Sequence, residues 1–321
     1  MLLADVPFIP ALWLAYQQEI SQEKSGFVRS GIIARNAAIE AEFAKGGRSI
    51  AIPHFNDLSG DAEILSDTTP LTAATLGGGV QLGVRHLQGR AWTSSDLAAE
   101  LAGDDPMFAI ARRTGEYWVR EQQKTLLAAL NGVFTGPLAA THVVNGGTAV
   151  PLGADSMIDG IATLGDAGQE LAAVAMHSGA YYYLAKKDLI QMPAGVISQL
   201  DTRVSAQRAE YGTYLGRPVI VDDTLPRTGN DYGIYFFAPG AVAYAECPAK
   251  TPVETDRDVL QGHEVLVNRK EFLLHPVGLS WIGTPAGESP TNVEYATGAN
   301  WRMEFQDPKN VRMVKLVATA A

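Results

Sequence analysis

Residues 215–223 read Leu-Gly-Arg-Pro-Val-Ile-Val-Asp-Asp, a short strand pattern between a glycine and two carboxylates. Two more stretches follow in order, Glu-Thr-Asp-Arg-Asp at 254–258 and His-Pro-Val-Gly-Leu-Ser-Trp at 275–281. Glycine and proline next to an apolar run favour a short strand bounded by turns. This ordered trio is the most informative pattern in the chain.

Composition places the chain among ordinary folded proteins. Of its 321 residues 46% are hydrophobic and 19% are charged, enough to build a large core in one broad domain or two. No apolar run reaches the roughly 18 residues that a membrane-spanning helix needs. The beginning of the chain also lacks the basic start and cleavage site of a signal peptide. We therefore expect no membrane association, and a cytoplasm as the compartment.

Charge and cysteine content exclude further classes. The single cysteine, Cys247, rules out an intrachain disulfide and a cysteine-based zinc site. The formal net charge of -10 opposes broad binding to nucleic acid, because phosphates require a basic surface. It does not oppose enclosing nucleic acid. The charge therefore fits both a container and an ordinary soluble enzyme.

Residues 1–45 have the pattern of a terminal arm laid along another surface. Prolines interrupt the beginning, and a short helical pattern follows through Leu12, Trp13, Tyr16 and Ile20. Aromatic residues at helical spacing usually pack locally. The alternative for Trp13 is a contact with a neighbouring subunit.

Residues 46–95 contain short strand patterns at 48–52 and 80–84. The stretch between them is rich in turn residues and offers little to bury, which favours a projecting hairpin. Two strands without a covering sheet are marginally stable, so such a hairpin normally rests on another surface. A long surface loop is the alternative.

The clearest helix begins near Asp105, which can cap it, with Pro106 in its first turn. Helix formers continue to Asn131 and Gly132, where we expect the helix to end. After it, the chain alternates helix and strand patterns in the manner of a compact α/β module. These are helices at 154–164 and 178–188, and strands at 171–176 and 217–221. The remaining strands are expected at 232–237, 242–245, 265–274 and 311–318.

Enzyme motifs are sparse. The chain has no Gly-x-Ser-x-Gly elbow and no Walker phosphate loop, and Val267 stands where a zinc-protease motif beginning at His263 needs its second histidine. Asp222 and Asp223 at the end of a strand could hold a divalent ion. Such a pair is more often a turn or a helix cap.

The three stretches, together with Asn300-Trp301, resemble the second half of major capsid proteins of tailed bacteriophages, the shell subunits with the Hong Kong 97 fold. The order of arm, hairpin, long helix and α/β module supports this resemblance. It implies an α+β capsid fold without catalytic, cofactor-binding or metal residues. The implied parts are an N-terminal arm (1–45), an extended loop (46–95), a spine helix with the first part of a peripheral domain (96–134), a mainly axial domain (135–245) and a strand-rich second part of the peripheral domain (246–321).

The resemblance also implies the function and the partners. We expect a structural protein that assembles into hexamers and pentamers of an icosahedral shell around double-stranded DNA, in a virion put together in the host cytoplasm. A separate scaffolding protein, a portal and a decoration protein are expected partners. Because no lysine lies between Ala51 and Ser94, an isopeptide bond from the hairpin to a neighbouring asparagine is not expected. The candidates for intersubunit contacts are Trp13, Asp61, Thr68, Thr69, Arg85, Glu254, Asp256 and Arg257.

Three alternatives remain open at this point. An encapsulin-like nanocompartment shell would have the same fold and a different cargo. A metal-dependent α/β enzyme would use Asp222, Asp223 and a nearby histidine. An accessory protein would bind only to preformed shells.

Overall fold

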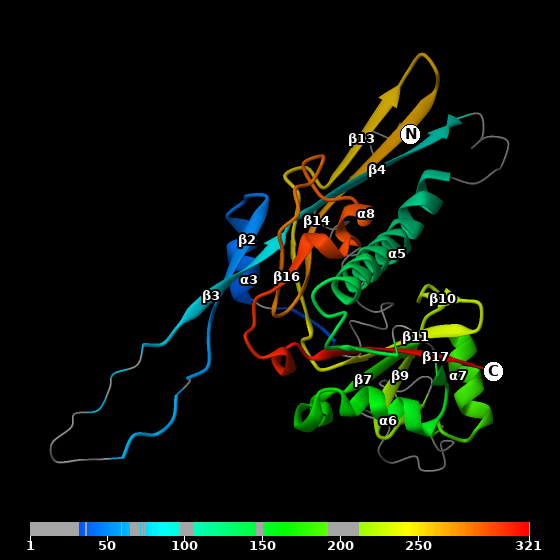
Figure 1. Cartoon of the computed structure of the whole chain (residues 1–321). Coiled ribbons are helices and arrows are strands. Elements are labelled where there is room, and N and C mark those ends of the chain that lie inside the picture. Colours follow the sequence, from blue (N-terminus) through cyan, green and yellow to red (C-terminus); the bar gives the residue numbers. More distant parts are fainter. Residues whose placement is uncertain are drawn as a thin grey trace, which may run out of the picture.

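The structure is a computed structural model that describes residues 32–35, 37–58, 60–64, 71, 73, 75–96, 106–145, 150–191 and 212–320. The molecule is elongated (Figure 1). A body with helices on a β-sheet carries an arm of long strands, and a loop projects away from both. The predicted helical pattern around Trp13 and the predicted cap Asp105 lie outside the described residues.

A five-stranded sheet forms the arm and part of the core. Its central strand β14 (His263–Pro276) pairs antiparallel with β12 (Val242–Cys247) and β13 (Val253–Asp258) along one side and with β4 (His86–Ser95) along the other. Strand β1 (Ile33–Arg35) adds to β12 in parallel. Helix α3 (Ala37–Ala44) buries Ile39 and Phe43 against β12 and β14.

An eight-stranded sheet forms the body. Strand β11 (Asp231–Phe237) lies between β17 (Met313–Thr319) and β7 (Ala173–Met176), antiparallel to both, and β7 continues in parallel to β9 (Arg217–Val221). The short strands are β5 (Val143–Val144), β6 (Val150–Pro151), β8 (Thr213–Tyr214) and β10 (Arg227–Thr228). Helices α6 (Ala154–Ala162) and α7 (Ser178–Lys186) and the 3-10 helix η2 (Gly165–Glu170) accompany this sheet.

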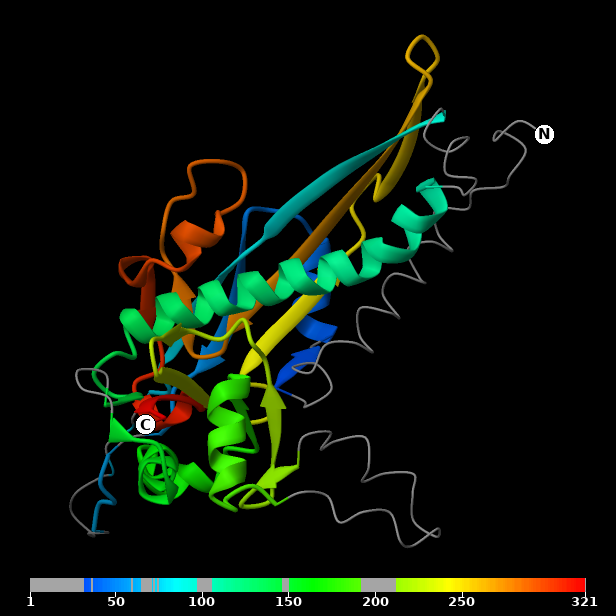
Figure 2. The ribbon, with the colours of Figure 1, turned by 90° about the vertical axis from the view of Figure 1, so that its right-hand side faces the viewer.

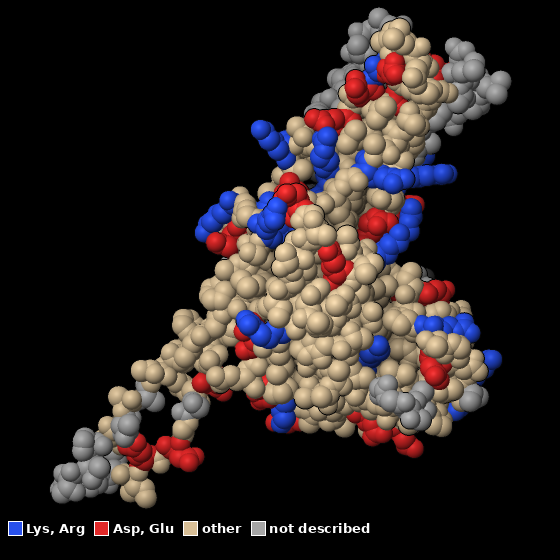
Figure 3. Space-filling view, turned by 45° about the horizontal axis from the view of Figure 1, so that its top comes forward, with Lys and Arg blue, Asp and Glu red and all other residues tan. Residues whose placement is uncertain are grey.

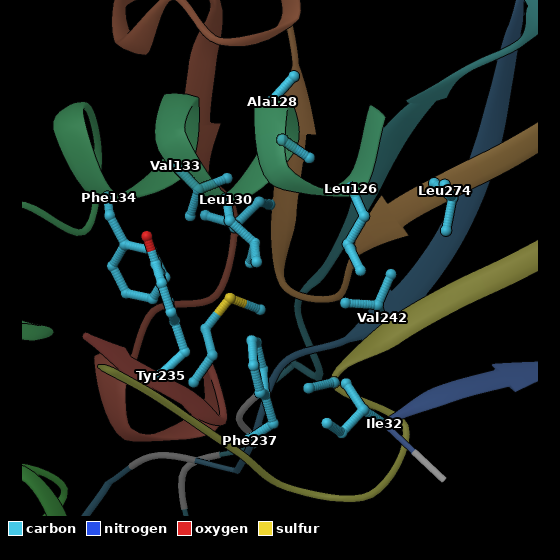
Figure 4. Close-up of a cluster of buried hydrophobic side chains, with 14 of the residues drawn as sticks. Ile32, Leu126, Ala128, Leu130, Val133, Phe134, Tyr235, Phe237, Val242 and Leu274 are labelled. Carbon is cyan, nitrogen blue, oxygen red and sulfur yellow. The ribbon is translucent and has the colours of Figure 1, made fainter. Parts of the chain in front are cut away.

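Helix α5 (Pro106–Thr135) crosses the molecule between the arm and the body (Figure 2). It buries Leu126 and Leu130 in a core shared with β11, β12 and β14, near Val242 and Phe237 (Figure 4). Trp118, nearer the start of the helix, is also buried. The indole nitrogen of Trp118 donates a hydrogen bond to Asn268 Oδ1 on β14 at 2.6 Å. The helix therefore joins both sheets.

The predicted end of this helix at Gly132 is wrong, because the helix continues to Thr135. Gly132 does not end the helix; it allows the helix to pack closely against the segment that contains Tyr295 and Trp301. A Cβ at this position would lie 2.4 Å from the carbonyl oxygen of Tyr295 and 2.5 Å from Nε1 of Trp301. The glycine thus lets the helix approach α8 (Asn292–Tyr295) and the chain that follows it.

The extended hairpin is formed by β2 (Ser49–Phe55) and β3 (Gly78–Val84), paired antiparallel. Strand β2 runs beyond the predicted end at Ile52. Arg85 N donates to the carbonyl oxygen of Arg48, and Asn56 N donates to the carbonyl oxygen of Gly77, so the even-numbered residues of β2 direct their backbone groups toward β3. The nitrogen of Pro53, which has no hydrogen to donate, therefore faces away from β3, where a proline is tolerated. The base of the hairpin is fixed by hydrogen bonds from Leu82 N to Ser280 Oγ, at 2.9 Å, and from Gly278 N to Gln81 Oε1, at 2.9 Å.

The sheets cross the predicted domain boundaries. Strand β4 lies within the predicted extended loop but pairs with β14. Strand β12 lies before residue 246 but belongs to the five-stranded sheet, whereas β17 lies after it and is central in the eight-stranded sheet. The assignment of these sheets to peripheral and axial domains stays a prediction. The remaining elements are β15 (Leu279–Trp281), β16 (Trp301–Met303), η3 (Gly298–Asn300) and η4 (Pro308–Asn310).

Candidate assembly surfaces

We define the distal loop as residues 56–77, and its described residues project away from the rest of the chain (Figure 1). The last hydrogen bond between its two sides runs from Asn56 N to Gly77 O at 3.0 Å. Its apolar side chains are turned out, and Ile64 is 94% exposed. Asp61 is exposed among them, whereas Thr68 and Thr69 lie outside the described residues. The other exposed apolar residues at or next to the loop are Phe55, Leu58, Leu71, Leu76 and Val80.

The arm ends in a second exposed apolar group. Val259 and Leu260, in the turn between β13 and β14, are 79% and 97% exposed. The carboxylate of Asp258 accepts hydrogen bonds from Leu260 N at 3.0 Å and Gln261 N at 3.3 Å. The turn is therefore an ordered knob at the tip of the arm. Sequence reasoning missed it, although two adjacent apolar residues before Gln-Gly in a turn were a visible signal.

The predicted charged contacts on β13 have partners within the chain. Arg257 bridges Asp96 at 2.6 Å and Glu264 at 2.8 Å. Glu254 pairs with Arg269 at 2.5 Å. Asp256 accepts a hydrogen bond from the backbone of Arg257, at 2.8 Å. These groups are solvent-exposed, so each contributes little to folding, and their role between subunits stays a prediction.

Arg85 is largely buried at the root of the hairpin. Its guanidinium pairs with Glu271 at 2.9 Å. It also donates a hydrogen bond to the carbonyl oxygen of Phe43 and lies 4.2 Å from the centre of the phenyl ring of Phe43. The side chain thus ties α3 and β14 to the strand that leads into the arm. Its predicted contact with another subunit is untested by these interactions.

A buried polar group under α5 was not predicted. Lys270 Nζ lies 3.2 Å from Glu246 Oε1, and both side chains are less than one-tenth exposed. Tyr244 donates a hydrogen bond to Glu246 and accepts one from Gln122 at 2.8 Å. Burial lowers the pKa of Lys270, while Glu246 opposes this shift. The sequence gave little signal, because Lys270 stands in the charged run Arg269-Lys270-Glu271 and does not differ in type from its exposed neighbours.

Asp222 and Asp223 act as caps. Asp222 Oδ1 accepts hydrogen bonds from the backbone and the hydroxyl of Thr224, at 2.9 and 2.6 Å. Asp223 Oδ1 accepts from Ser178 N at 3.2 Å, and hydrogen bonds from Ser178 lower the pKa of Asp223. Among the described residues, no group of three or more His, Cys, Asp or Glu side chains is placed to hold a metal ion.

Ser178, His177 and Asp223 also lack the geometry of a nucleophile relay. Ser178 Oγ lies 3.4 Å and Asp223 Oδ1 lies 3.7 Å from the same ring nitrogen, Nδ1 of His177. That nitrogen already accepts a hydrogen bond from Gly179 N at 3.0 Å. A relay needs the acid and the nucleophile on opposite ring nitrogens. The three side chains instead shape the first turn of α7.

Within the described part of the chain, no helix is long and apolar enough to span a membrane. Among the described residues, strongly exposed apolar side chains gather at the distal loop and at the knob of the arm, at opposite ends of the molecule. Groups of this kind on a folded chain mark contacts with other proteins.

Comparisons with known proteins agree on one class. A model of the Gp13-like family, described as major capsid protein 13-like, matches residues 91–312. The major capsid protein of Bacillus phage SPP1 is 36% identical over 323 residues, which is 98% of this chain and 96% of that protein.

Solved structures show the same fold at low identity. The capsid of Ralstonia phage GP4 matches with a TM-score of 0.64 and 10% identity, over 91% of this chain and 88% of that chain. The capsid asymmetric unit of cyanophage Pam1 matches with a TM-score of 0.60 and 12% identity, over 94% and 93%. The resemblance to capsid subunits with the Hong Kong 97 fold is therefore confirmed, and the chain belongs to the Gp13-like family of tailed-phage major capsid proteins.

Proposed function

We propose that the chain assembles into hexamers and pentamers of a closed icosahedral shell around double-stranded DNA, and that it catalyses no reaction. The observation that carries this proposal is the distal loop. Its described apolar side chains include Leu58 and Ile64, which are 80% and 94% exposed, and no described part of the chain covers them. In a shell, a neighbouring copy would cover the loop.

The net charge supports a container over a nucleic acid binder. A subunit with a formal charge of -10 gains no broad attraction for phosphates, so enclosed DNA could move in and out without being held by the wall. Each contact between subunits can be modest, because the symmetry of the shell repeats it many times. A separate scaffolding protein, a portal and a decoration protein are the partners we propose, with assembly in the host cytoplasm and the finished shell in the virion.

Electron microscopy after size-exclusion chromatography tests this function. The purified protein, with and without its scaffolding partner, should form closed shells, tubes or capsomer rings. Leu58→Ser combined with Ile64→Ser should reduce these particles strongly, because it removes apolar surface that no described residue of the subunit covers. Ile158→Ser on α6, a half-exposed position in the body, is the matched control. Small discrete oligomers of the wild type under every condition would refute the proposal.

A further inference from the structure

The outer side of α5 carries arginines that the subunit leaves unpaired. Figure 2 shows the helix in front of the arm, and no described element covers its outer side. Helical spacing turns Arg113 and Arg120 away from the buried Trp118, and the neighbouring Arg112 is exposed like both of them. Within the described part of the chain, these three guanidinium groups have neither an ion pair nor a hydrogen bond.

Arg90 of β4 adds a fourth guanidinium on the same side of the arm. Side chains alternate between the two faces of a strand, and Trp92, two residues further on, meets Tyr117 of α5 edge-on at 5.3 Å. Arg90 therefore lies on the face of the arm that carries α5. It is exposed and, among the described residues, has no partner for its side chain. We define the arginine patch as Arg90, Arg112, Arg113 and Arg120.

The other described arginines differ from the patch, because each contacts an acid or a backbone carbonyl oxygen. They are Arg35, Arg48, Arg85, Arg217, Arg227, Arg257, Arg269, Arg302 and Arg312. Figure 3 shows basic side chains projecting where the arm meets the body, whereas the distal loop displays acidic ones. In a chain with a formal net charge of -10, unpaired arginines on one surface indicate a negatively charged partner outside the subunit.

Acids of the subunit neutralise the patch only in part. Glu116 lies between Arg113 and Arg120 in the sequence. Glu121 is paired with Lys124 at 2.6 Å, so this acid and this base offset each other. The patch as a whole therefore keeps a positive charge.

The chemistry of the patch favours phosphates over a folded protein as the partner. Among the described residues, no large apolar side chain of α5 is exposed, whereas contacts between proteins normally have an apolar centre. A guanidinium binds phosphate oxygens through two parallel hydrogen bonds. Arg113 and Arg120 are two helical turns apart, roughly 10 Å along the axis. A DNA duplex presents several phosphates over such a length.

We propose that the arginine patch binds phosphate groups of the enclosed double-stranded DNA, so that the outer side of α5 faces the interior of the shell. This inference rests on the proposed shell function and names the surface of the subunit that touches the contents. The contact is independent of base sequence, because phosphates carry no sequence information. It is confined to the patch and weakens steeply with salt, so the acidic remainder of the wall does not hold the DNA.

Binding of the unassembled full-length subunit to a fluorescein-labelled DNA duplex, measured by anisotropy over a salt series, tests the patch. Arg113→Gln with Arg120→Gln should weaken binding at low salt roughly tenfold and reduce the slope of log affinity against log salt by about 2. Arg48→Gln with Arg302→Gln is the matched control, because it removes the same charge from two exposed ion pairs. The control should keep the affinity and the slope of the wild type.

A conservative variant separates charge from structure. Arg113→Lys with Arg120→Lys should keep most of the salt slope, because the release of counterions depends on charge. Circular dichroism establishes that each variant folds, and Arg90→Gln with Arg113→Gln replaces the glutamine variant if it does not. Equal affinity and slope for the glutamine variant and the control would overturn the patch as a phosphate site. Absence of binding by the wild type at low salt would overturn it as well.

Microscopy of particles formed without DNA separates this inference from the shell function. The glutamine variant should form particles like the wild type. Loss of particles by the folded variant would overturn the patch as a DNA site, because the arginines would then serve a contact with another protein of the shell. A wild type that forms no particles would instead refute the shell function.

A labelled polyglutamate peptide tests the class of ligand. The subunit should bind the DNA duplex more tightly than this peptide at the same salt concentration, because the duplex has the higher density of charge. Tighter binding of polyglutamate, lost in the glutamine variant, would overturn DNA as the ligand and assign the patch to an acidic protein.

Discussion

The distal loop and the packing around α5 use similar apolar residues in opposite ways. Leu126 and Leu130 of α5 are almost completely buried by the chain itself, whereas Leu58 and Ile64 in the loop are almost completely exposed. Burying a leucine stabilises a fold by roughly 1.5–3 kcal/mol, and this gain is absent for the loop in a single subunit. The core therefore stabilises the subunit, whereas the loop leaves its apolar surface exposed, and we propose that assembly covers it.

This difference predicts that changes in the core act on folding and changes in the loop act on particle formation. Four changes in the core and arm, in order of decreasing effect, test whether these regions act on folding. A change in the loop tests whether the loop acts on particle formation.

The largest expected effect comes from Lys270→Met. It leaves the buried Glu246 with the hydrogen bond from Tyr244 and, among the described residues, with Arg35 at 3.9 Å as its one cation, and an uncompensated buried charge costs about 3 kcal/mol or more. Urea unfolding of the unassembled subunit measures the loss. Combining the change with Glu246→Gln should recover most of it, and a double variant as unstable as the single one would contradict this account of the pair.

Gly132→Ala should destabilise the subunit by about 2 kcal/mol, although alanine normally favours a helix. The added Cβ would approach the carbonyl oxygen of Tyr295 within 2.4 Å. Gly153→Ala is the control, because a Cβ there meets nothing within 4 Å. Thermal unfolding should show a lower Tm for Gly132→Ala alone. An equal Tm for both variants would show that the approach of α5 to Tyr295 is not tight.

Acid should destabilise the subunit through two buried histidines. Burial lowers the pKa of His86 to about 3 and that of His275 to about 4, below the ordinary value of 6.5 that applies when the chain is unfolded. Below pH 6.5 the unfolded chain therefore binds more protons than the folded chain. The stability that the two neutral histidines contribute is complete above pH 6.5 and falls as the pH drops toward 4. Between pH 6.5 and 5 the loss is about 2 kcal/mol per histidine.

The measurement is the free energy of unfolding as a function of pH for the wild type and for His86→Phe. His86 stacks on Phe272 at 5.2 Å and meets Tyr295 edge-on at 4.7 Å, so phenylalanine can take its place. The variant should lose part of the pH dependence while it remains folded. An unchanged slope between pH 6.5 and 5 would contradict the assignment.

The smallest expected effect is that of Arg257→Ala. The pairs of Arg257 with Asp96 and Glu264 are exposed, so their loss should cost less than about 1 kcal/mol of subunit stability. Chemical unfolding with and without 0.5 M salt should show little difference between variant and wild type. A loss of several kcal/mol would mean that the arm depends on this residue as the core depends on Lys270.

Local features of the fold could be read from the sequence. The start of α5 at Pro106, the two hairpin strands and the α/β alternation all follow from nearby residues. The end of α5 could not be predicted from nearby residues, because Gly132 packs against Trp301, which lies in a distant part of the sequence. The placement of β17 beside β11 is likewise a long-range pairing that no local pattern specifies.

The candidate contacts were less predictable for a related reason. Glu254, Asp256 and Arg257 have the composition of an exposed strand, and the structure places them there with partners in the same chain. Arg85 has the same chemistry but is largely buried, because α3 folds over it from a remote segment. Val259 and Leu260 carry a local signal of an exposed turn, but their place at the tip of the arm depends on the pairing of β14 with β13 and β4. The charge of a residue alone does not distinguish an exposed contact between subunits from a buried ion pair within the chain.

The most direct test of the central claim compares Leu58→Ser with Ile64→Ser in one chain against Leu126→Ala, measuring both unfolding free energy and particle yield. The loop variant should keep the wild-type unfolding free energy within about 0.5 kcal/mol and lose its particles. Leu126→Ala should lose about 2–5 kcal/mol of stability. A loop variant that is destabilised like the core variant, or that assembles like the wild type, would contradict the division of roles between the two regions.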